Sequence, residues 1–508
     1  MKKLCDFCIY SIKTIALAIS CLLLVLVLTN RAFQTQGKDG VIQIFRQPIW
    51  YYILLLVSIV CILAVRKLLD KVSPNVLFVV FTAIYLLMGL YLILNVTPDI
   101  RSDQRDVFDA ALQFNQGNWE QFRTGRELFR NPHNIGIATF YSLVTSINQS
   151  TKFAFAINLI FIILTNLFLY RTAVLCFKNR AAAAYTVLFS FAFLPQFFYT
   201  LFIYGNVPGF CFVTAMIFFA AKMLKEEHTA VINKTVYGIL AVVCGATAVL
   251  MRNNYIIAVI AVVIICAIKF MKDKKTVNII LAALLMLSVI IAPDMLKGHY
   301  ERKIGYELDG IPMNLYIAMG LQEAEKGPGW YNGFNHHTFE ENGFDTEKSA
   351  EAGREAIKER ISYFADNPQY AFAFFRDKVI TTWCEPTCQS IYSGPVESKG
   401  QIVENPVLKN LYGGGKLYEI VYLFCNIIIT DILLFSIICQ ISAFKDKKFS
   451  LWMLCILLFF VGGFLFHIMW ETKSRYICIY YAALAPIAAN GAKVMTDKLK
   501  KVLSDRTV

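Results

Sequence analysis

The sequence predicts an all-α polytopic membrane protein of about 12 transmembrane helices, with a mostly helical outer loop domain. Three observations support this prediction: a hydrophobic content of 57% with only 17% charged residues, long apolar runs that recur along the chain, and Lys and Arg residues that follow those runs. Soluble domains are roughly 45–50% apolar, and the mean hydropathy here is +0.53. Soluble, disordered and collagen-like classes are therefore excluded.

The apolar runs approach the length that a membrane-crossing helix needs. Residues 14–28, 76–94 and 277–292 are examples, and ~20 apolar residues span a bilayer. The first run follows Lys2 and Lys3 and resembles a signal peptide, but no small-residue cleavage site precedes Asn30. We therefore expect it to be retained as the first transmembrane helix.

The basic residues predict the orientation of these helices. The segments that we assign to the cytoplasm carry 24 Lys and Arg and 8 Asp and Glu, whereas the rest of the chain carries 25 and 28. This asymmetry follows the positive-inside rule and places both termini in the cytoplasm. The net charge of +13 is therefore explained by topology, and we expect no nucleic-acid partner. The segments are residues 1–13, 66–71, 171–180, 222–234, 269–275, 445–448 and 493–508.

Two long polar segments divide the chain on the outer side. The second has a Gly-rich beginning at residues 326–333 and helical periodicity at residues 346–364 and 368–383. The predicted regions are 1–94 (three N-terminal transmembrane helices), 95–150 (first outer loop, with amphipathic helices at 102–114 and 133–147), 151–293 (central transmembrane helices), 294–416 (large outer loop domain), 417–495 (last three transmembrane helices) and 496–508 (basic cytoplasmic tail).

The sequence lacks the common motifs of cofactor and metal binding. It has no Walker loop, no GxGxxG and no zinc-type Cys/His spacing, so we expect no cofactor and no metal. Most of the 14 Cys lie in apolar runs, where they act as small hydrophobes. Cys384 and Cys388 fall in a polar segment, where a local disulfide and two free thiols are both open.

Unusual polar residues fall at one level of the predicted topology, the outer membrane face. Ionisable groups at membrane depth are costly, so their alignment predicts a shared site. A lipid phosphate held by Arg, with a carboxylate nearby as base, fits this set. The residues are Asp103, Gln104, Asp106, Arg130, His133, Asn134, Tyr204, Asn206, Arg252, Asn254, His467, Glu471 and Arg475.

Several of these residues also have a structural interpretation. Asp103 could favour its helix N-terminus through the helix dipole, and His133 follows Asn-Pro at a helix start. Arg252 could snorkel to the membrane surface. Glu471 and Arg475 have the i,i+4 spacing of a helical ion pair. Each of the first three interpretations would remove one residue from the predicted site, and the ion pair would remove two.

Short motifs at these positions resemble a known group of enzymes. The motifs are Ser102-Asp103-Gln104, Arg130-Asn-Pro-His-Asn134, Tyr204-Gly-Asn206, Met319-Gly-Leu321 with Gly329-Trp-Tyr-Asn-Gly333, and Glu471-Thr-Lys-Ser-Arg475-Tyr476. With these motifs and its two outer loops, the chain resembles the GT-C superfamily of membrane glycosyltransferases. The resemblance is strongest to the branch that uses polyprenyl-phosphate sugars, which includes protein O-mannosyltransferases and lipid A aminoarabinose transferases.

The chain also departs from that branch. Its acidic loop follows the third span, whereas the branch places this loop after the first, so we expect two extra N-terminal helices outside the shared core. Where protein mannosyltransferases carry Asp-Glu, this chain has Asp103-Gln104, which keeps one candidate base and loses the second acid. The resemblance implies that Asp103 is the general base and that Arg252 and Arg475 hold the donor phosphate.

The predicted function is transfer of a sugar from a polyprenyl-phosphate-linked donor to an acceptor hydroxyl of an unidentified cell-envelope glycan, lipid or protein. The lipid phosphate is itself the leaving group, so the reaction needs no nucleotide. Asp103 would take the proton of the acceptor in a single inverting displacement. The expected location is the lipid bilayer of a bacterial plasma membrane, with the active site facing outside.

Two other functions fit the same pattern. A transporter or flippase for a lipid-linked or small anionic substrate would use Arg252, Asp431 and Arg475 along its path, with essential polar residues at mid-membrane. Outside such a path, Asp431 fits a packing or hydrogen-bonding role within its span. A non-catalytic assembly or sensor protein would leave Asp103 dispensable.

Overall fold

The structure, a computed structural model, describes residues 2–35, 40–225, 230–395, 401, 403–445 and 450–505. Over these residues the chain is almost entirely helical. It has 10 helices that are long and apolar enough to cross a membrane, or up to 12 spans if each of two bent helix pairs counts as one. The predicted fold class, an all-α polytopic membrane protein, is confirmed.

The N-terminal part contains a short hairpin that the sequence analysis did not predict. Its two antiparallel strands pair with Ala32 opposite Ile44. Ala32 also donates its backbone N–H to the Cys384 carbonyl at 2.9 Å, so contacts with the large outer loop help to fix the hairpin. The elements are α1 (Lys2–Thr29), β1 (Asn30–Gln34), β2 (Ile42–Arg46), α2 (Ile49–Ala64), α3 (Arg66–Leu69) and α4 (Pro74–Asn95).

The first outer loop folds into short helices at the places where amphipathic helices are predicted. α5 begins at Asp103, buries Val107 and Ala110, and packs against α7, as apolar residues at i,i+3 spacing predict. A Cβ on Gly136 of α7 would lie 2.0 Å from the Leu250 carbonyl oxygen, so α7 and the end of the following α12 are in close contact. The elements are α5 (Asp103–Asn115), η1 (Glu120–Phe122), α6 (Glu127–Arg130), η2 (Pro132–Asn134) and α7 (Ile135–Ile147).

The central helices are interrupted at polar positions that the sequence analysis selected. α11 begins at Asn206, and α12 ends just before Arg252. A Cβ on Gly205 would lie 2.1 Å from the Met251 carbonyl oxygen, so the two interruptions are adjacent in space. The elements are α8 (Thr151–Phe177), α9 (Arg180–Ala192), α10 (Leu194–Phe198), η3 (Tyr199–Leu201), α11 (Asn206–Met223), α12 (Val231–Met251), η4 (Asn253–Tyr255), α13 (Ile256–Asp273) and α14 (Thr276–Ile304).

The large outer loop contains the two helices predicted at 346–364 and 368–383, and the last spans follow it. Cys384 and Cys388, directly after the second of these helices, are buried free thiols. The elements are α15 (Met313–Gly320), α16 (Phe334–Glu341), α17 (Thr346–Asp366), α18 (Pro368–Trp383), α19 (Pro406–Tyr412), α20 (Lys416–Lys445), α21 (Leu451–Met469), α22 (Ser474–Ala483) and α23 (Ala485–Asp505).

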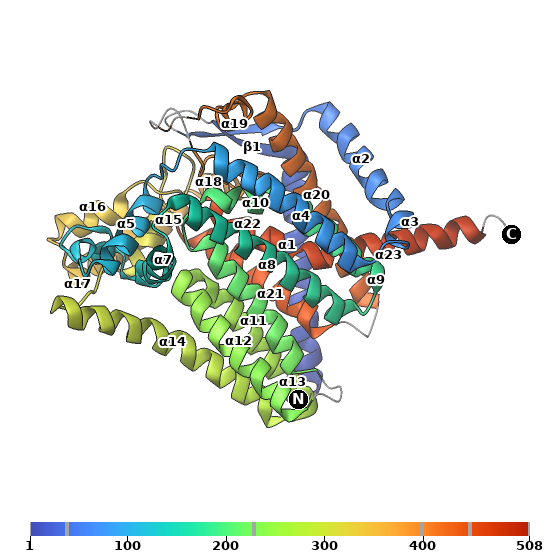
Figure 1. Ribbon diagram of the computed structural model, residues 1–508, viewed down its shortest axis with the longest axis horizontal. Helices are drawn as coiled ribbons and strands as arrows, with labels where there is room; N and C mark the ends of the chain where they lie inside the picture. Colours follow the sequence, from blue (N-terminus) through green and yellow to red (C-terminus); the bar gives the residue numbers. More distant parts are fainter. Residues whose placement is uncertain are drawn as a thin grey trace.

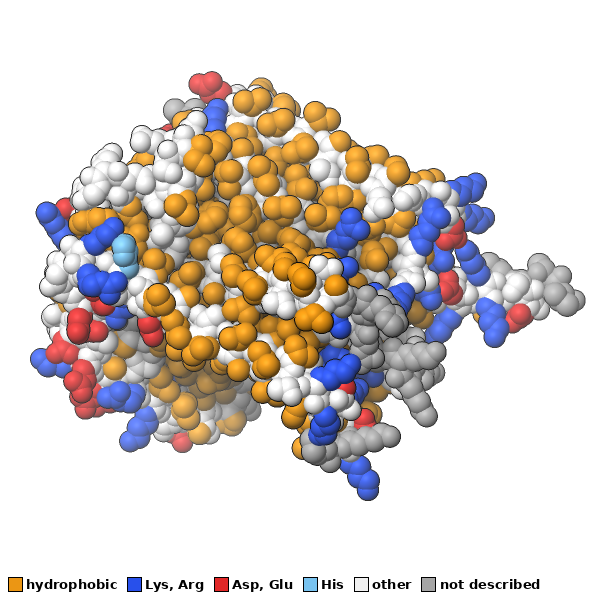
Figure 2. Space-filling view, turned by 60° about the horizontal axis from the view of Figure 1, so that its bottom comes forward, with side chains coloured by type: hydrophobic (Ala, Val, Ile, Leu, Met, Phe, Trp, Pro, Cys, Tyr) orange, Lys and Arg blue, Asp and Glu red, His pale blue; other side chains and the backbone are white. Residues whose placement is uncertain are grey.

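The outer-loop helices gather at one end of the molecule. Figure 1 shows α5, α7, α15, α16 and α17 together at that end, with α14 reaching toward them, while α23 extends from the opposite end. Figure 2 shows a broad hydrophobic face between an end with both acidic and basic side chains and an end where basic side chains predominate. A hydrophobic face between polar ends is what helices in a bilayer require.

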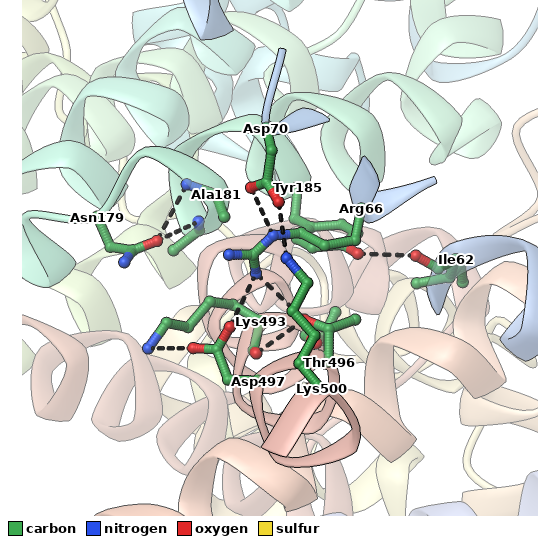
Figure 3. A network of polar contacts seen from close by, with 12 residues as sticks. Ile62, Arg66, Asp70, Asn179, Ala181, Tyr185, Lys493, Thr496, Asp497 and Lys500 are labelled. Carbon is green, nitrogen blue, oxygen red and sulfur yellow. Dashed lines mark hydrogen bonds and ion pairs between the residues drawn. The ribbon is translucent and has the colours of Figure 1, made fainter. Parts of the chain in front are cut away.

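Basic segments that we predict to be cytoplasmic meet in one polar network (Figure 3). Arg66 pairs with Asp70 at 2.8 Å and with Asp497 at 3.3 Å, and Lys500 reaches Asp70 at 2.8 Å. The Asn179 side chain caps α9 beside this network. Segments 66–71, 171–180 and 493–505 therefore lie on one side of the membrane helices. Residues 1, 226–229, 446–448 and 506–508 of the predicted cytoplasmic segments lie outside the described part of the chain.

The orientation of this network and of the outer loops can be tested by labelling. We expect a Cys introduced at Asn115 or Glu341 to react with a membrane-impermeant maleimide in intact cells, because both positions belong to the outer-loop helices. A Cys at Lys272, at the basic end of α13, should react only after the membrane is opened. The measurement needs a background without the native Cys. Labelling of position 272 in intact cells would reverse the proposed orientation.

Candidate active site

A cavity of about 980 Å³ lies between the outer loops and the ends of the membrane helices. Residues of α5, η2, η4, α14, α15 and the segment between α21 and α22 line it, together with the chain before α11. Asp106, Arg130 and Asn206 of the predicted site do not line it. The predicted residues that do are Asp103, Gln104, His133, Asn134, Tyr204, Arg252, Asn254, His467, Glu471 and Arg475.

An ion pair between Asp103 and Arg475 forms one wall of the cavity. The Arg475 Nη2 donates to the Asp103 Oδ2 at 2.7 Å, and the two side chains are 14% and 42% exposed. Ser102, just before α5, has a left-handed backbone with φ of 51°, which turns the chain into the helix. Burial raises the pKa of the Asp103 carboxyl, but Arg475 and Lys473 outweigh burial and hold that pKa well below its usual range.

Arg252 is held between two tyrosine rings in the interruption after α12. Its guanidinium lies 4.6 Å from the Tyr476 ring centre and 5.7 Å from that of Tyr204. Its Nη1 donates to Asn206 Oδ1 at 2.7 Å, and Asn206 Nδ2 donates to the Arg475 carbonyl at 3.3 Å. Asn206 therefore supports both arginines from behind the cavity wall. This fixed position does not fit a freely snorkelling Arg252.

The segment between α21 and α22 adds a third cation. Lys473 Nζ pairs with Glu471 at 3.3 Å and lies 4.9 Å from the Tyr331 ring centre. The alternative i,i+4 pair between Glu471 and Arg475 is not formed, because Arg475 pairs with Asp103. Arg252 has no carboxylate partner among the described residues. The cation cluster therefore has one guanidinium that is not neutralised by an ion pair.

Some buried polar atoms of the lining have no hydrogen-bond partner within the described chain. The nitrogens among them are Nε of Arg101, Nε of Arg475 and both ring nitrogens of His467, whose side chain is 3% exposed, and the oxygens are the amide oxygens of Asn254, Asn335 and Gln389. Buried polar groups usually have a partner, so such groups point toward a ligand. Arg475 can only donate, and neutral His467 has one donor nitrogen. A ligand rich in acceptor oxygens, such as a phosphate, matches these donors.

Lys378 of α18 holds the cation-bearing segment from behind. Its side chain is 1% exposed, and its Nζ donates to the carbonyl oxygens of Gly320 at 2.5 Å, Ile468 at 2.8 Å and Trp470 at 2.9 Å. These bonds join α15 and α18 to the chain that leads into Glu471. The sequence analysis missed Lys378, because a Lys in a polar loop normally faces water.

Gln104 ties α5 to two distant parts of the chain. Its Nε2 donates to the Ser393 carbonyl at 3.0 Å, and its Oε1 accepts from the Ile203 backbone N–H at 2.9 Å. With both amide groups engaged in this way, Gln104 anchors the start of α5. Arg130 lies outside the lining, where it pairs with Glu340 at 3.0 Å.

His133 and Glu127 lie close to the asparagines of the same turn. Burial, together with Arg252, lowers the pKa of His133 to about 4, so this imidazole is neutral at neutral pH. Burial, with a further contribution from Asp103, raises the pKa of Glu127 to about 7. Glu127 lines the cavity, yet the sequence analysis did not select it. It stands in a charged stretch of the first outer loop, where a single Glu gives no signal of its own.

The fold and this cation-lined cavity define a polytopic integral membrane protein with a polar site at one end of its helices. Among the described residues, no three His, Cys, Asp or Glu side chains are grouped so that they could hold a metal ion. The chain belongs to the family described as conserved hypothetical integral membrane protein, whose model matches residues 4–362. The sequence matches none of the curated proteins with which it was compared.

Solved structures of membrane enzymes show a distant likeness to the chain. One is the apo oligosaccharyltransferase of Archaeoglobus fulgidus, with a TM-score of 0.43 and 13% identity, over 85% of this chain and 52% of that one. Another is ArnT of Cupriavidus metallidurans bound to undecaprenyl phosphate, with a TM-score of 0.37 and 12% identity, over 82% of this chain and 77% of that one. The chain thus spans about half the length of the oligosaccharyltransferase. Both are of the glycosyltransferase superfamily that the sequence resembles.

Removing the Lys378 ammonium should destabilise the segment that leads into Glu471. Lys378→Met would leave the carbonyls of Gly320, Ile468 and Trp470 without this donor, and each unsatisfied buried group costs about 1–3 kcal/mol. We expect a clear drop in melting temperature of the purified protein. Lys358→Met, at an exposed position of α17, is the matched control and should leave the melting temperature nearly unchanged. Equal melting temperatures for the two variants would contradict the supporting role of Lys378.

Proposed function

We propose that the protein is a membrane glycosyltransferase that moves a sugar from a polyprenyl-phosphate-linked donor to an acceptor hydroxyl. The observation that carries the proposal is the cation cluster of the cavity, formed by Arg252, Lys473 and Arg475. Among the described residues, Arg252 has no carboxylate partner and the Nε of Arg475 has no hydrogen-bond partner. A lipid phosphate is both the ligand for such cations and a ready leaving group. Undecaprenyl phosphate, bound in the ArnT structure, is a polyprenyl phosphate, the class of lipid that the proposed transfer would release.

Two guanidinium groups suit the charge that develops on the departing phosphate. Arg252 and Arg475 approach the same Tyr476 ring, at 4.6 Å and 5.4 Å from its centre. Fixed donors aimed at a developing charge lower the barrier of a displacement, because they need no reorganisation during the reaction. Both arginines are already fixed by Asn206 and by aromatic rings. In the proposed reaction they bind the donor phosphate and then the released lipid phosphate.

The acceptor hydroxyl must lose a proton as it attacks the anomeric carbon. Asp103, which the sequence analysis predicts as the base, lies in the cavity wall beside Arg475, and Glu127 is a second carboxylate of the same cavity. A carboxylate in either place serves a single inverting displacement without a nucleotide. The acceptor is a cell-envelope glycan, lipid or protein, and the site faces the outside of a bacterial plasma membrane in this proposal.

The alternative function of transporter or flippase has less support, because Asp431 lies apart from the cavity lining. Asp431, which would line that path, accepts a hydrogen bond from Ser58 of α2 at 2.6 Å. It is not among the residues that line the cavity with Arg252 and Arg475. The polar residues of the cavity instead gather where the outer loops meet the helices, which favours chemistry at the membrane face.

Deletion of the gene tests the proposed function directly. An unused polyprenyl-phosphate sugar should accumulate, and one envelope glycan should lose a sugar, because the transfer step is missing. Mass spectrometry of extracted lipids and of envelope glycans measures both. The identified donor then serves for assays with the purified protein. A deletion strain whose polyprenyl-phosphate sugars and glycans are both unchanged would contradict the proposal.

The phosphate contacts can be tested one at a time. Arg252→Ala and Arg475→Ala should each weaken binding of polyprenyl phosphate about 10- to 150-fold, because a charge-assisted hydrogen bond contributes about 1.5–3 kcal/mol. Lys at either position should restore binding poorly wherever the Arg bonds the phosphate through two N–H groups. Binding is measured with purified protein in nanodiscs. Wild-type affinity in both Ala variants would remove the phosphate from this part of the cavity.

A further inference from the structure

Glu127 has the surroundings of a proton acceptor, and we infer that Glu127, rather than Asp103, takes the proton of the acceptor hydroxyl. The inference rests on the glycosyl transfer proposed above and concerns the same cavity. In this step the acceptor oxygen bonds to the anomeric carbon, and its proton moves to Glu127 Oε2. The bond from the anomeric carbon to the phosphate oxygen breaks, and its electron pair stays on the lipid phosphate.

Two asparagines hold the Glu127 carboxylate in one orientation. Asn131 and Asn134 both donate from Nδ2 to Glu127 Oε1, at 3.1 Å and 2.9 Å. Their amide oxygens are fixed in turn, because Tyr316 donates to Asn131 Oδ1 at 2.5 Å and Tyr204 donates to Asn134 Oδ1 at 3.2 Å. The other oxygen, Oε2, accepts no hydrogen bond from the described residues. It is therefore the oxygen left for a proton.

The Asp103 carboxylate has different surroundings, because it already forms an ion pair with a cation. Arg475 Nη2 lies 2.7 Å from its Oδ2, and Lys473 adds a second positive charge nearby. Cations beside a carboxylate disfavour its protonated form, which makes it a weak base. Glu127 forms no ion pair with a Lys or Arg of the described chain. Asp103 is then a positioning residue for Arg475, and Glu127 is the freer proton acceptor.

Charged and titratable groups reach Glu127 from several elements. The carboxylates of α5 raise its proton affinity, the tyrosines face it in the neutral form, and the imidazole of its own turn is neutral near pH 7. With burial as the largest cause, the pKa of Glu127 is raised to about 7, and a base works best when its pKa lies near the working pH. The groups that act on Glu127 are Asp103 and Asp106 of α5, Tyr204 before α11 and Tyr316 of α15, and the imidazole is that of His133.

The test compares two carboxylate variants over a range of pH. The donor is the polyprenyl-phosphate sugar that accumulates in the deletion strain, and the acceptor is the envelope fraction of that strain. With Glu127 ionised only above its pKa, wild-type turnover should rise with pH through about 7 and then level off. Glu127→Gln keeps an acceptor oxygen for both asparagines, so it should fold and bind polyprenyl phosphate normally. Its turnover should fall about 10²–10⁴-fold, without the rise through pH 7.

The other variants separate a base from a positioning residue. Asp103→Asn should change the affinity for polyprenyl phosphate through Arg475 and keep a rise in turnover with pH. That rise should move to lower pH, because the Asp103 charge no longer raises the pKa of Glu127. Glu120→Gln, in the same loop but paired with exposed Arg123, is the control for Glu127 and should behave as wild type. Asp109→Asn serves in the same way for Asp103. Near wild-type turnover of Glu127→Gln, or loss of the pH-dependent rise in Asp103→Asn, would overturn the inference and return the base to Asp103.

A variant of Asn134, one of the two asparagines that bond to Glu127, keeps the test decisive even if Glu127→Gln does not fold. Asn134 stabilises the ionised form of Glu127, so its removal raises the carboxyl pKa. Asn134→Ala should therefore shift the rise in turnover to higher pH, and an unshifted profile counts against Glu127. Failure of the proposed function looks different. In that case the wild-type protein itself transfers no sugar from the accumulated lipid at any pH.

Discussion

The ion pair between Asp103 and Arg475 closes the candidate site, because it joins the first outer loop to the last membrane helices. The two residues are 372 positions apart, and their atoms meet at 2.7 Å. Gln104, the next residue, fixes the same helix start to Ile203 and Ser393. The Arg475 side chain is only 14% exposed, so its charge needs a partner more than the 42% exposed Asp103 does. The ion pair and the two hydrogen bonds of Gln104 together place the start of α5 at the cavity wall.

Much of the fold could be predicted from the sequence because a bilayer imposes simple rules. A helix must satisfy its own backbone hydrogen bonds in lipid and must be long enough to cross, so apolar runs mark the spans without knowledge of packing. The hairpin of β1 and β2 could not be predicted in this way. Its strands are short, and Ala32 bonds to Cys384. Such a partner is visible only after the chain has folded.

Residues of the candidate site could be predicted where a charged side chain interrupts an apolar run, because burying a charge there costs free energy. They could not be predicted where the charged side chain stands in a polar loop. Arg252 and Arg475 break apolar runs, so each requires an explanation, and both line the cavity. Glu127 and Lys378 stand in polar loops, where charged residues are normal. Only the fold shows that Glu127 is clamped by asparagines and that Lys378 is 1% exposed. Arg130, by contrast, was selected by its motif and pairs with Glu340 outside the lining.

The arrangement of charges also explains how such a site can be stable before its ligand arrives. Arg475 is neutralised by Asp103, and Lys473 by Glu471, while the guanidinium groups of Arg252 and Arg475 both lie close to the Tyr476 ring. Of these three cations, Arg252 has no ion-pair partner among the described residues and so retains attraction for an anion. In the proposed reaction, a phosphate that binds Arg475 takes the place of the Asp103 carboxylate beside its guanidinium. The guanidinium is then never left unpaired in a buried place, which avoids most of the desolvation penalty.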